Sequence, residues 1–168
     1  RGEPLREFVK INPPQEVQLI IYLSSKHHGG LFTWTYNFCQ QMKDYDITVL
    51  HEGMDPELIR KLLPIVDVRQ CGDPIKCETL IMMRIGDDVP ANIRYERCIQ
   101  MLHSTHLDDR WQLPKDRDVI IPISETVRRS WGIEHEPILN MTYKESDGIQ
   151  LISATRLKTA EKGMDRIK

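Results

Sequence analysis

The chain has 168 residues, of which 40% are hydrophobic and 29% are charged, and its formal net charge at pH 7 is −2. This composition is typical of a globular protein, and the length suits one α/β domain of ordinary size. The net charge argues against nucleic acid as the main partner, because binding to a phosphate backbone needs a concentrated positive surface. The longest strongly apolar run, Val17 to Leu23, has the length of a strand and is far shorter than a membrane span.

The N-terminus and the cysteines indicate the cellular setting. No apolar stretch has the form of a signal peptide, and the chain begins with Arg1 in place of Met, which indicates a trimmed sequence. Residues 1–15 are polar and contain several prolines, so we expect an N-terminal extension there. The cysteines form no CxxC pair, so we expect reduced cysteines of a cytoplasmic protein and neither a disulfide framework nor a metal site.

The first part of the chain predicts a strand, a loop and a helix in succession. The apolar run from Val17 to Leu23 is expected to be a central parallel strand that is buried on both faces. A polar loop from Ser24 to Gly30 follows it. The next helix is amphipathic, and its apolar face carries Leu31, Trp34, Phe38 and Met42.

Strands and helices alternate along the rest of the chain. Strands are expected over residues 46–50, 66–68, 80–85, 98–102 and 119–123, and helices over 55–63 and 124–131. Segment 84–96 is expected to be a loop, 108–118 an exposed segment and 140–148 a linker. This alternation indicates the α/β class, with a doubly wound, mostly parallel, Rossmann-like sheet.

The loop KHHGG, from Lys26 to Gly30, is the first candidate site. In open α/β sheets, ligands bind beyond the carboxyl ends of the strands, where this loop is expected. Gly29 and Gly30 would let the backbone come close to a ligand and would place N–H groups at a helix N-terminus. The pattern is not G-x-G-x-x-G, so the dinucleotide fingerprint is absent. The alternative is a simple turn that leads into the helix.

The second candidate site is the pair of histidines at the end of the fifth predicted strand. His103 follows that strand directly, and an imidazole can be neutral or charged near physiological pH. We therefore predict that His103 is a site residue, although a structural histidine is the alternative. His106 lies three residues further on and is either a partner on the acceptor side or a loop histidine.

The third candidate is the Ser124-Glu125 pair that begins the last predicted helix. Ser124 is a good N-cap residue, and the charge of Glu125 favours the positive end of a helix. Capping accounts for both residues without any chemistry, so we prefer that interpretation. A contribution to ligand recognition is the alternative.

The final stretch, residues 151–168, predicts a short strand, a basic turn and the start of a helix. Arg156 and Lys162 could face one bound anion across this turn, next to free backbone N–H groups. The chain ends at Lys168 within the predicted helix, and we therefore interpret it as a fragment.

This stretch carries a resemblance to a known family. The segment SATRLKTAEKGMDRI resembles the strand–turn–helix that opens the second domain of retaining family-4 glycosyltransferases, which have the two-Rossmann GT-B architecture. The family pattern is close to G-R-L-x-x-x-K-G, and Thr155 stands here in place of its glycine. The resemblance covers roughly residues 17–168, with the glycine loop, the strand-end histidine, the Ser-Glu pair and the Arg and Lys in family order. It implies an acceptor-side domain over 16–148 and the start of a nucleotide-sugar domain over 149–168.

The resemblance implies a sugar transfer that retains the anomeric configuration. The donor would be a UDP- or GDP-linked sugar whose diphosphate is held by Arg156 and Lys162, and the acceptor a glycan or a lipid-linked glycan. His103 would contact the transferring sugar, and the Gly-Gly pair would meet donor phosphate and acceptor. No metal or cofactor is expected, because cationic side chains would stabilise the leaving diphosphate. We expect a cytoplasmic enzyme of cell-surface polysaccharide or glycolipid synthesis, associated peripherally with the inner face of the membrane, and an inactive fragment.

Two other classes stay open from the residues alone. A nicotinamide-dependent enzyme is disfavoured by the absent glycine fingerprint, although Glu52 does follow the second predicted strand. A non-catalytic α/β binding or regulatory domain is the other alternative. A receiver domain would need acidic residues after the first strand, where this chain has Lys26, His27 and His28.

Overall fold

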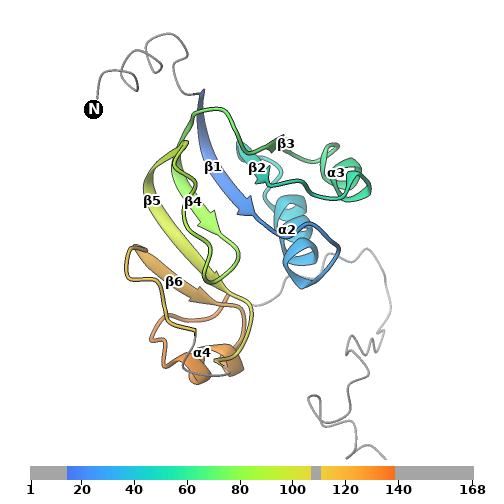
Figure 1. Ribbon diagram of the computed structural model, residues 1–168. Helices are drawn as coiled ribbons and strands as arrows, with labels where there is room; N and C mark the ends of the chain where they lie inside the picture. Colours follow the sequence, from blue (N-terminus) through green and yellow to red (C-terminus); the bar gives the residue numbers. More distant parts are fainter. Residues whose placement is uncertain (1–14, 107–110, 139–168) are drawn as a thin grey trace, which may run out of the picture.

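The computed structural model describes residues 15–106 and 111–138, and all structural statements below concern these residues (Figure 1). Several predictions lie outside them: the N-terminal extension except for Gln15, which begins the first strand, the whole linker over 140–148 and the terminal strand–turn–helix with Arg156 and Lys162.

The described residues form one parallel sheet of six strands, with helices beside it. The elements are β1 (Gln15–Leu23), α2 (Gly30–Gln41), β2 (Ile47–His51), α3 (Pro56–Leu62), β3 (Asp67–Gln70), β4 (Ile75–Met82), β5 (Ile93–Leu102), β6 (Val119–Pro122) and α4 (Glu125–Trp131). The strand order is β3-β2-β1-β4-β5-β6, and every neighbouring pair is parallel. This order is the doubly wound, Rossmann-like arrangement, so the predicted α/β class is confirmed.

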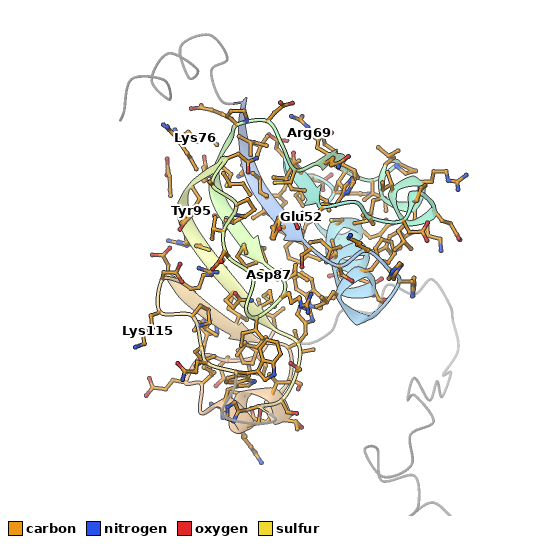
Figure 2. The ribbon with its side chains drawn as sticks, in the orientation of Figure 1. Glu52, Arg69, Lys76, Asp87, Tyr95 and Lys115 are labelled. Carbon is orange, nitrogen blue, oxygen red and sulfur yellow. The ribbon has the colours of Figure 1, made fainter. Side chains whose placement is uncertain are left out.

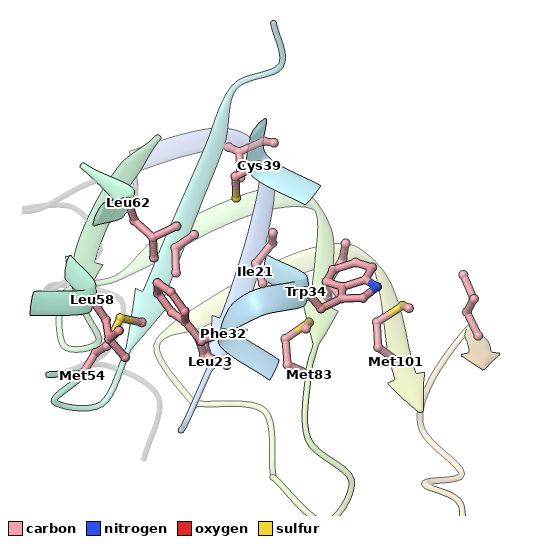
Figure 3. Packing of buried hydrophobic residues seen from close by; sticks show 14 residues of the cluster. Ile21, Leu23, Phe32, Trp34, Cys39, Met54, Leu58, Leu62, Met83 and Met101 are labelled. Atoms are coloured by element: carbon pink, nitrogen blue, oxygen red, sulfur yellow. The ribbon is translucent and has the colours of Figure 1, made fainter. Parts of the chain in front are cut away.

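The central strand β1 has apolar side chains on both faces of the sheet. Ile21 and Leu23 belong to the cluster that α2 and α3 cover, and Figure 3 shows both residues with Phe32 and Trp34 of α2. Ile20 belongs to the cluster on the opposite face, which the connection between β4 and β5 covers in part. A strand that is buried on both faces needs apolar side chains at successive positions, and the sequence of β1 has them from Leu19 to Leu23.

Two strand boundaries differ from the prediction. The strand expected over 80–85 runs from Ile75 to Met82, and β5 begins at Ile93 instead of residue 98, so the end of the predicted loop 84–96 is strand. The cause is alternation at the start of β4, where the buried residues Ile75 and Cys77 flank a half-exposed Lys76. Only the second half of β4 and of β5 has buried side chains on both faces of the sheet. A continuous apolar run therefore marks that half of the strand and does not mark the first half.

Local capping explains where the two later helices begin. Asp55 precedes α3, and its carboxylate accepts a hydrogen bond from Glu57 N at 2.9 Å, with Pro56 as the first helical residue. The Ser124 side chain caps α4 in the same way, and the left-handed Gly132, at φ 64°, ends that helix. These caps fix where the loops at the carboxyl edge of the sheet meet the helices.

Candidate functional site at the carboxyl edge of the sheet

A pocket of about 340 Å³ lies beyond the carboxyl ends of β4 and β5. It is lined by Leu31, Met83, Arg84, Ile85, Leu102, His103, Ser104, Thr105, Trp111 and Trp131. Leu31 belongs to the first turn of α2, so the start of that helix forms one wall. The strand order reverses between β1 and β4, and open α/β sheets bind ligands at such a switch point.

His103, the first residue after β5, supplies the buried polar atom of this pocket. Its Nε2 atom is buried and has no hydrogen-bond partner among the described residues. The imidazole lies edge-on to Trp34, with 5.7 Å between the ring centroids. Burial lowers the pKa of His103 to about 4, so the ring is neutral at pH 7. A buried polar atom without a partner is rare in folded proteins, and a ligand or a water molecule could satisfy this one.

His106 lies behind the pocket and not in its lining. Its backbone N–H donates to Ser130 Oγ at 3.0 Å, and its Nε2 lies 3.2 Å from the Trp111 carbonyl oxygen. The ring also packs against Trp131, with 4.5 Å between centroids. Through these contacts His106 holds the loop after β5 against α4. Its geometry therefore fits the alternative that it is a structural histidine of the loop.

The Gly29-Gly30 backbone is open to solvent at the start of α2. A Cβ atom added to either glycine would meet nothing within 4 Å. Gly29 is in the extended region, with φ −176°, so neither turn geometry nor packing requires a glycine there. Because Gly29 is the N-cap and has no side chain to cap the helix, the first N–H groups of α2 lack a side-chain partner. They are available to an anion.

Ser124 and Glu125 are engaged within α4. Ser124 Oγ accepts a hydrogen bond from Val127 N at 3.2 Å. The Glu125 carboxylate accepts from the Arg128 guanidinium at 2.7 and 2.9 Å and from Arg129 Nε at 2.7 Å. Hydrogen bonds from Arg128 and then Arg129 lower the pKa of Glu125 to about 2. The predicted capping role of Ser124 is confirmed.

A second polar group beside the carboxyl edge was not predicted as a site. Ser24 Oγ donates to Asp87 Oδ2, and the Glu52 carboxylate lies close enough to the Tyr22 hydroxyl to affect its pKa. Burial, and then the neighbouring Glu52 and Asp87, raise the pKa of Tyr22. Figure 2 labels the two carboxylates, with Lys76 at the opposite end of the sheet. The available signal was that Ser24 and Glu52 each follow a predicted strand.

Most of the described residues of segment 108–118 are exposed, as predicted, but Arg117 is an exception. Its side chain is only 3% exposed, and Nη2 donates to the Asp87 carbonyl oxygen at 3.0 Å. The sequence around it is polar, so composition gave no sign that the aliphatic stem of an arginine is buried there.

His51, at the end of β2, is a buried histidine of a different kind. Its Nδ1 accepts hydrogen bonds from Gly53 N at 3.1 Å and from Met54 N at 3.0 Å. Nδ1 is therefore unprotonated, and burial lowers the pKa of the ring. His51 shapes the turn that holds Glu52, in which Gly53 is left-handed at φ 94°.

Across residues 15–106 and 111–138, no group of three or more His, Cys, Asp or Glu side chains could hold a metal ion. In the same residues, no helix has the length and apolar character to cross a membrane. Fold and pocket define an α/β protein of Rossmann-like architecture with a hollow at its carboxyl edge. No protein-family model, curated protein or solved structure matches the chain.

Proposed function

We propose that the chain supplies the acceptor-side domain of a retaining GT-B glycosyltransferase. The enzyme would move a sugar from a UDP- or GDP-linked donor to a glycan or lipid-linked acceptor, in the cytoplasm and at the inner face of the membrane. The observation that supports this most is the unpartnered Nε2 of His103 beside the carboxyl-edge pocket. The uncapped start of α2 forms a wall of the same pocket.

The chemistry of sugar transfer suits a neutral histidine at this position. The transition state carries positive charge on the transferring sugar ring, which a protonated imidazole would repel. A neutral ring can instead exchange a hydrogen bond with a sugar hydroxyl group. The first N–H groups of α2 would face donor phosphate, since a helix N-terminus attracts anions.

The negative charge of the leaving diphosphate must also be stabilised. Arg156 and Lys162, outside the described residues, would do so through charge-assisted hydrogen bonds. A nicotinamide-dependent enzyme receives less support, since the glycine fingerprint is absent after β1, although Glu52 follows β2.

The test uses a longer protein in which this chain continues past Lys168 into a second Rossmann domain, as the resemblance implies. UDP- and GDP-sugars are supplied with glycan acceptors, and the release of UDP or GDP and the anomeric configuration of the product are measured. We expect transfer with retention. Tight binding of nucleotide sugars without any transfer would contradict the proposal and favour the non-catalytic binding domain.

A further inference from the structure

Two indole rings, those of Trp111 and Trp131, line the pocket. Trp131 Nε1 donates to the Ser104 carbonyl oxygen at 2.7 Å, and its ring contacts His106. Trp111 lies over Gly86, where an added Cβ atom would come within 3.1 Å of the indole. Gly86 also has a φ of +86°, so both its backbone and the ring above it require glycine. Because the N–H group of Trp131 already donates to Ser104, the indole can contact a ligand only through its apolar face.

Arg84 places a positive charge on the same wall. Its side chain is exposed and makes no hydrogen bond or ion pair with any residue of 15–106 or 111–138. By contrast, Arg128 binds Glu125, and the buried Arg117 binds a backbone carbonyl oxygen. The donors of Arg84 therefore make no hydrogen bond with the described residues, and the planar fork of an arginine suits a carboxylate or a phosphate.

Together these groups define the chemistry of a ligand. Indole faces and the apolar lining from Leu31, Met83 and Ile85 select an apolar surface, while the unpartnered Nε2 of His103 calls for a hydroxyl or similar group. A pyranose ring has both, since its C–H face is apolar and its edge carries hydroxyls. The volume of about 340 Å³ lies near the lower end of the range for small-molecule pockets.

We propose that this pocket binds an anionic saccharide, with a sugar ring stacked on the indoles of Trp111 and Trp131 and its carboxylate or phosphate on Arg84. The inference rests on the proposed function, because it names the class of saccharide that this same site, with His103 in it, would take. A neutral glycan would offer the Arg84 guanidinium no charge-assisted hydrogen bond.

The test is titration calorimetry of the chain with methyl glucuronide, glucose 6-phosphate and the neutral methyl glucoside. We expect the glucoside to bind at least about tenfold more weakly than one of the two anions, as charge-assisted hydrogen bonds exceed neutral ones. The two anionic arms separate a carboxylate from a phosphate. Arg84→Gln should remove the preference, and Arg94→Gln, an equal loss of charge on an exposed side chain of β5, should retain it.

Trp111→Ala supplies a second variant, since this half-exposed side chain can be removed with little loss of core packing. It should weaken the binding of all three saccharides together. Equal affinity for the glucoside and both anions, an unchanged preference in Arg84→Gln, or preferred binding of UDP would each overturn the inference. A different result would contradict the proposed function alone: the chain would bind saccharides with a preference for the anions, but the longer protein would transfer no sugar.

Discussion

Two histidines at the carboxyl edge, the buried His51 and the half-buried His103, differ in what their ring nitrogens contact. His51 Nδ1 accepts two backbone hydrogen bonds, so a local turn satisfies it. His103 Nε2 is buried and has no partner in the described part of the chain. Burial lowers the pKa of both rings, so the pKa alone would not separate them. The contacts do: His51 has a structural role, and His103 is available to a ligand.

The first prediction concerns His103 and its neighbour His106. In the longer protein, His103→Ala should lower the rate of sugar transfer more than about tenfold, or roughly 1.4 kcal/mol of barrier. His106→Ala should cost less, because that ring contacts Trp131 and the Trp111 carbonyl and is absent from the pocket lining. Steady-state rates of the two variants decide the point, and the opposite ranking would show that the wrong histidine was assigned.

The second prediction concerns the open backbone at Gly30. Gly30→Val should fold normally, since a Cβ there meets nothing within 4 Å. It should nevertheless weaken turnover, because a branched side chain would stand between the first N–H groups of α2 and a ligand. Gly72→Val is the matched control, as Gly72 is equally open and lies in the connection between β3 and β4, not at the start of a helix. Wild-type activity in Gly30→Val would mean that the glycines only form a turn.

At the scale of the element, a variant of α4 can distinguish whether Ser124 caps the helix or contributes to ligand recognition. Ser124→Ala removes the acceptor for Val127 N and should lower the free energy of unfolding by about 1 kcal/mol. Urea unfolding measures this, with the exposed Thr126→Ala as a control that should change stability much less. Binding of saccharide by the folded variant should remain at the wild-type level. A loss of binding without a loss of stability would favour the recognition alternative.

The elements also show what the sequence alone could predict. β1 and the start of α3 were predictable, because a continuous apolar run and an Asp-Pro cap are local signals. The amino-terminal halves of β4 and β5 were missed, as their outer residues alternate between buried and exposed. Local signals of this kind depend on a few neighbouring residues.

The site was less predictable than the fold, since it depends on register and loop packing. His103 was found because it directly follows a strand. Arg84 was not, because the predicted strand ran to residue 85 whereas β4 ends at Met82, and no pattern along the chain indicated Trp111. The same holds for Asp87, which meets Ser24 across 63 residues of sequence. Such contacts are set only once the parallel strands are in register.

At the scale of the whole molecule, the two faces of the sheet are covered differently. Helices α2 and α3 cover one face, with Trp34 and Leu58 in its cluster. Val89, from the connection between β4 and β5, packs against the other. The pocket lies where the start of α2 meets the residues that follow β4 and β5. Its floor therefore belongs to the rigid sheet, and its outer wall to connections that tolerate change.

The last prediction concerns the stability of the whole molecule in acid. His103 has a pKa of about 4 in the folded protein, below the ordinary value of 6.5. Between these two values the unfolded chain binds more protons, so the free energy of unfolding falls as the pH decreases from 6.5 toward 4. His51, whose pKa burial also lowers, acts in the same direction. The Glu125 carboxylate, with its pKa of about 2, adds its own loss only below about pH 4.5.

Thermal unfolding between pH 7 and pH 4.5 should therefore show a steadily lower midpoint, and His103→Phe should flatten that dependence. Phenylalanine keeps an aromatic ring beside Trp34 and cannot take up a proton in this range. His135→Phe serves as the control, since His135 is exposed and its variant should retain the wild-type slope. An unchanged slope in His103→Phe would mean that the His103 imidazole is not kept neutral by burial. A neutral His103 ring would then no longer be expected at the transferring sugar.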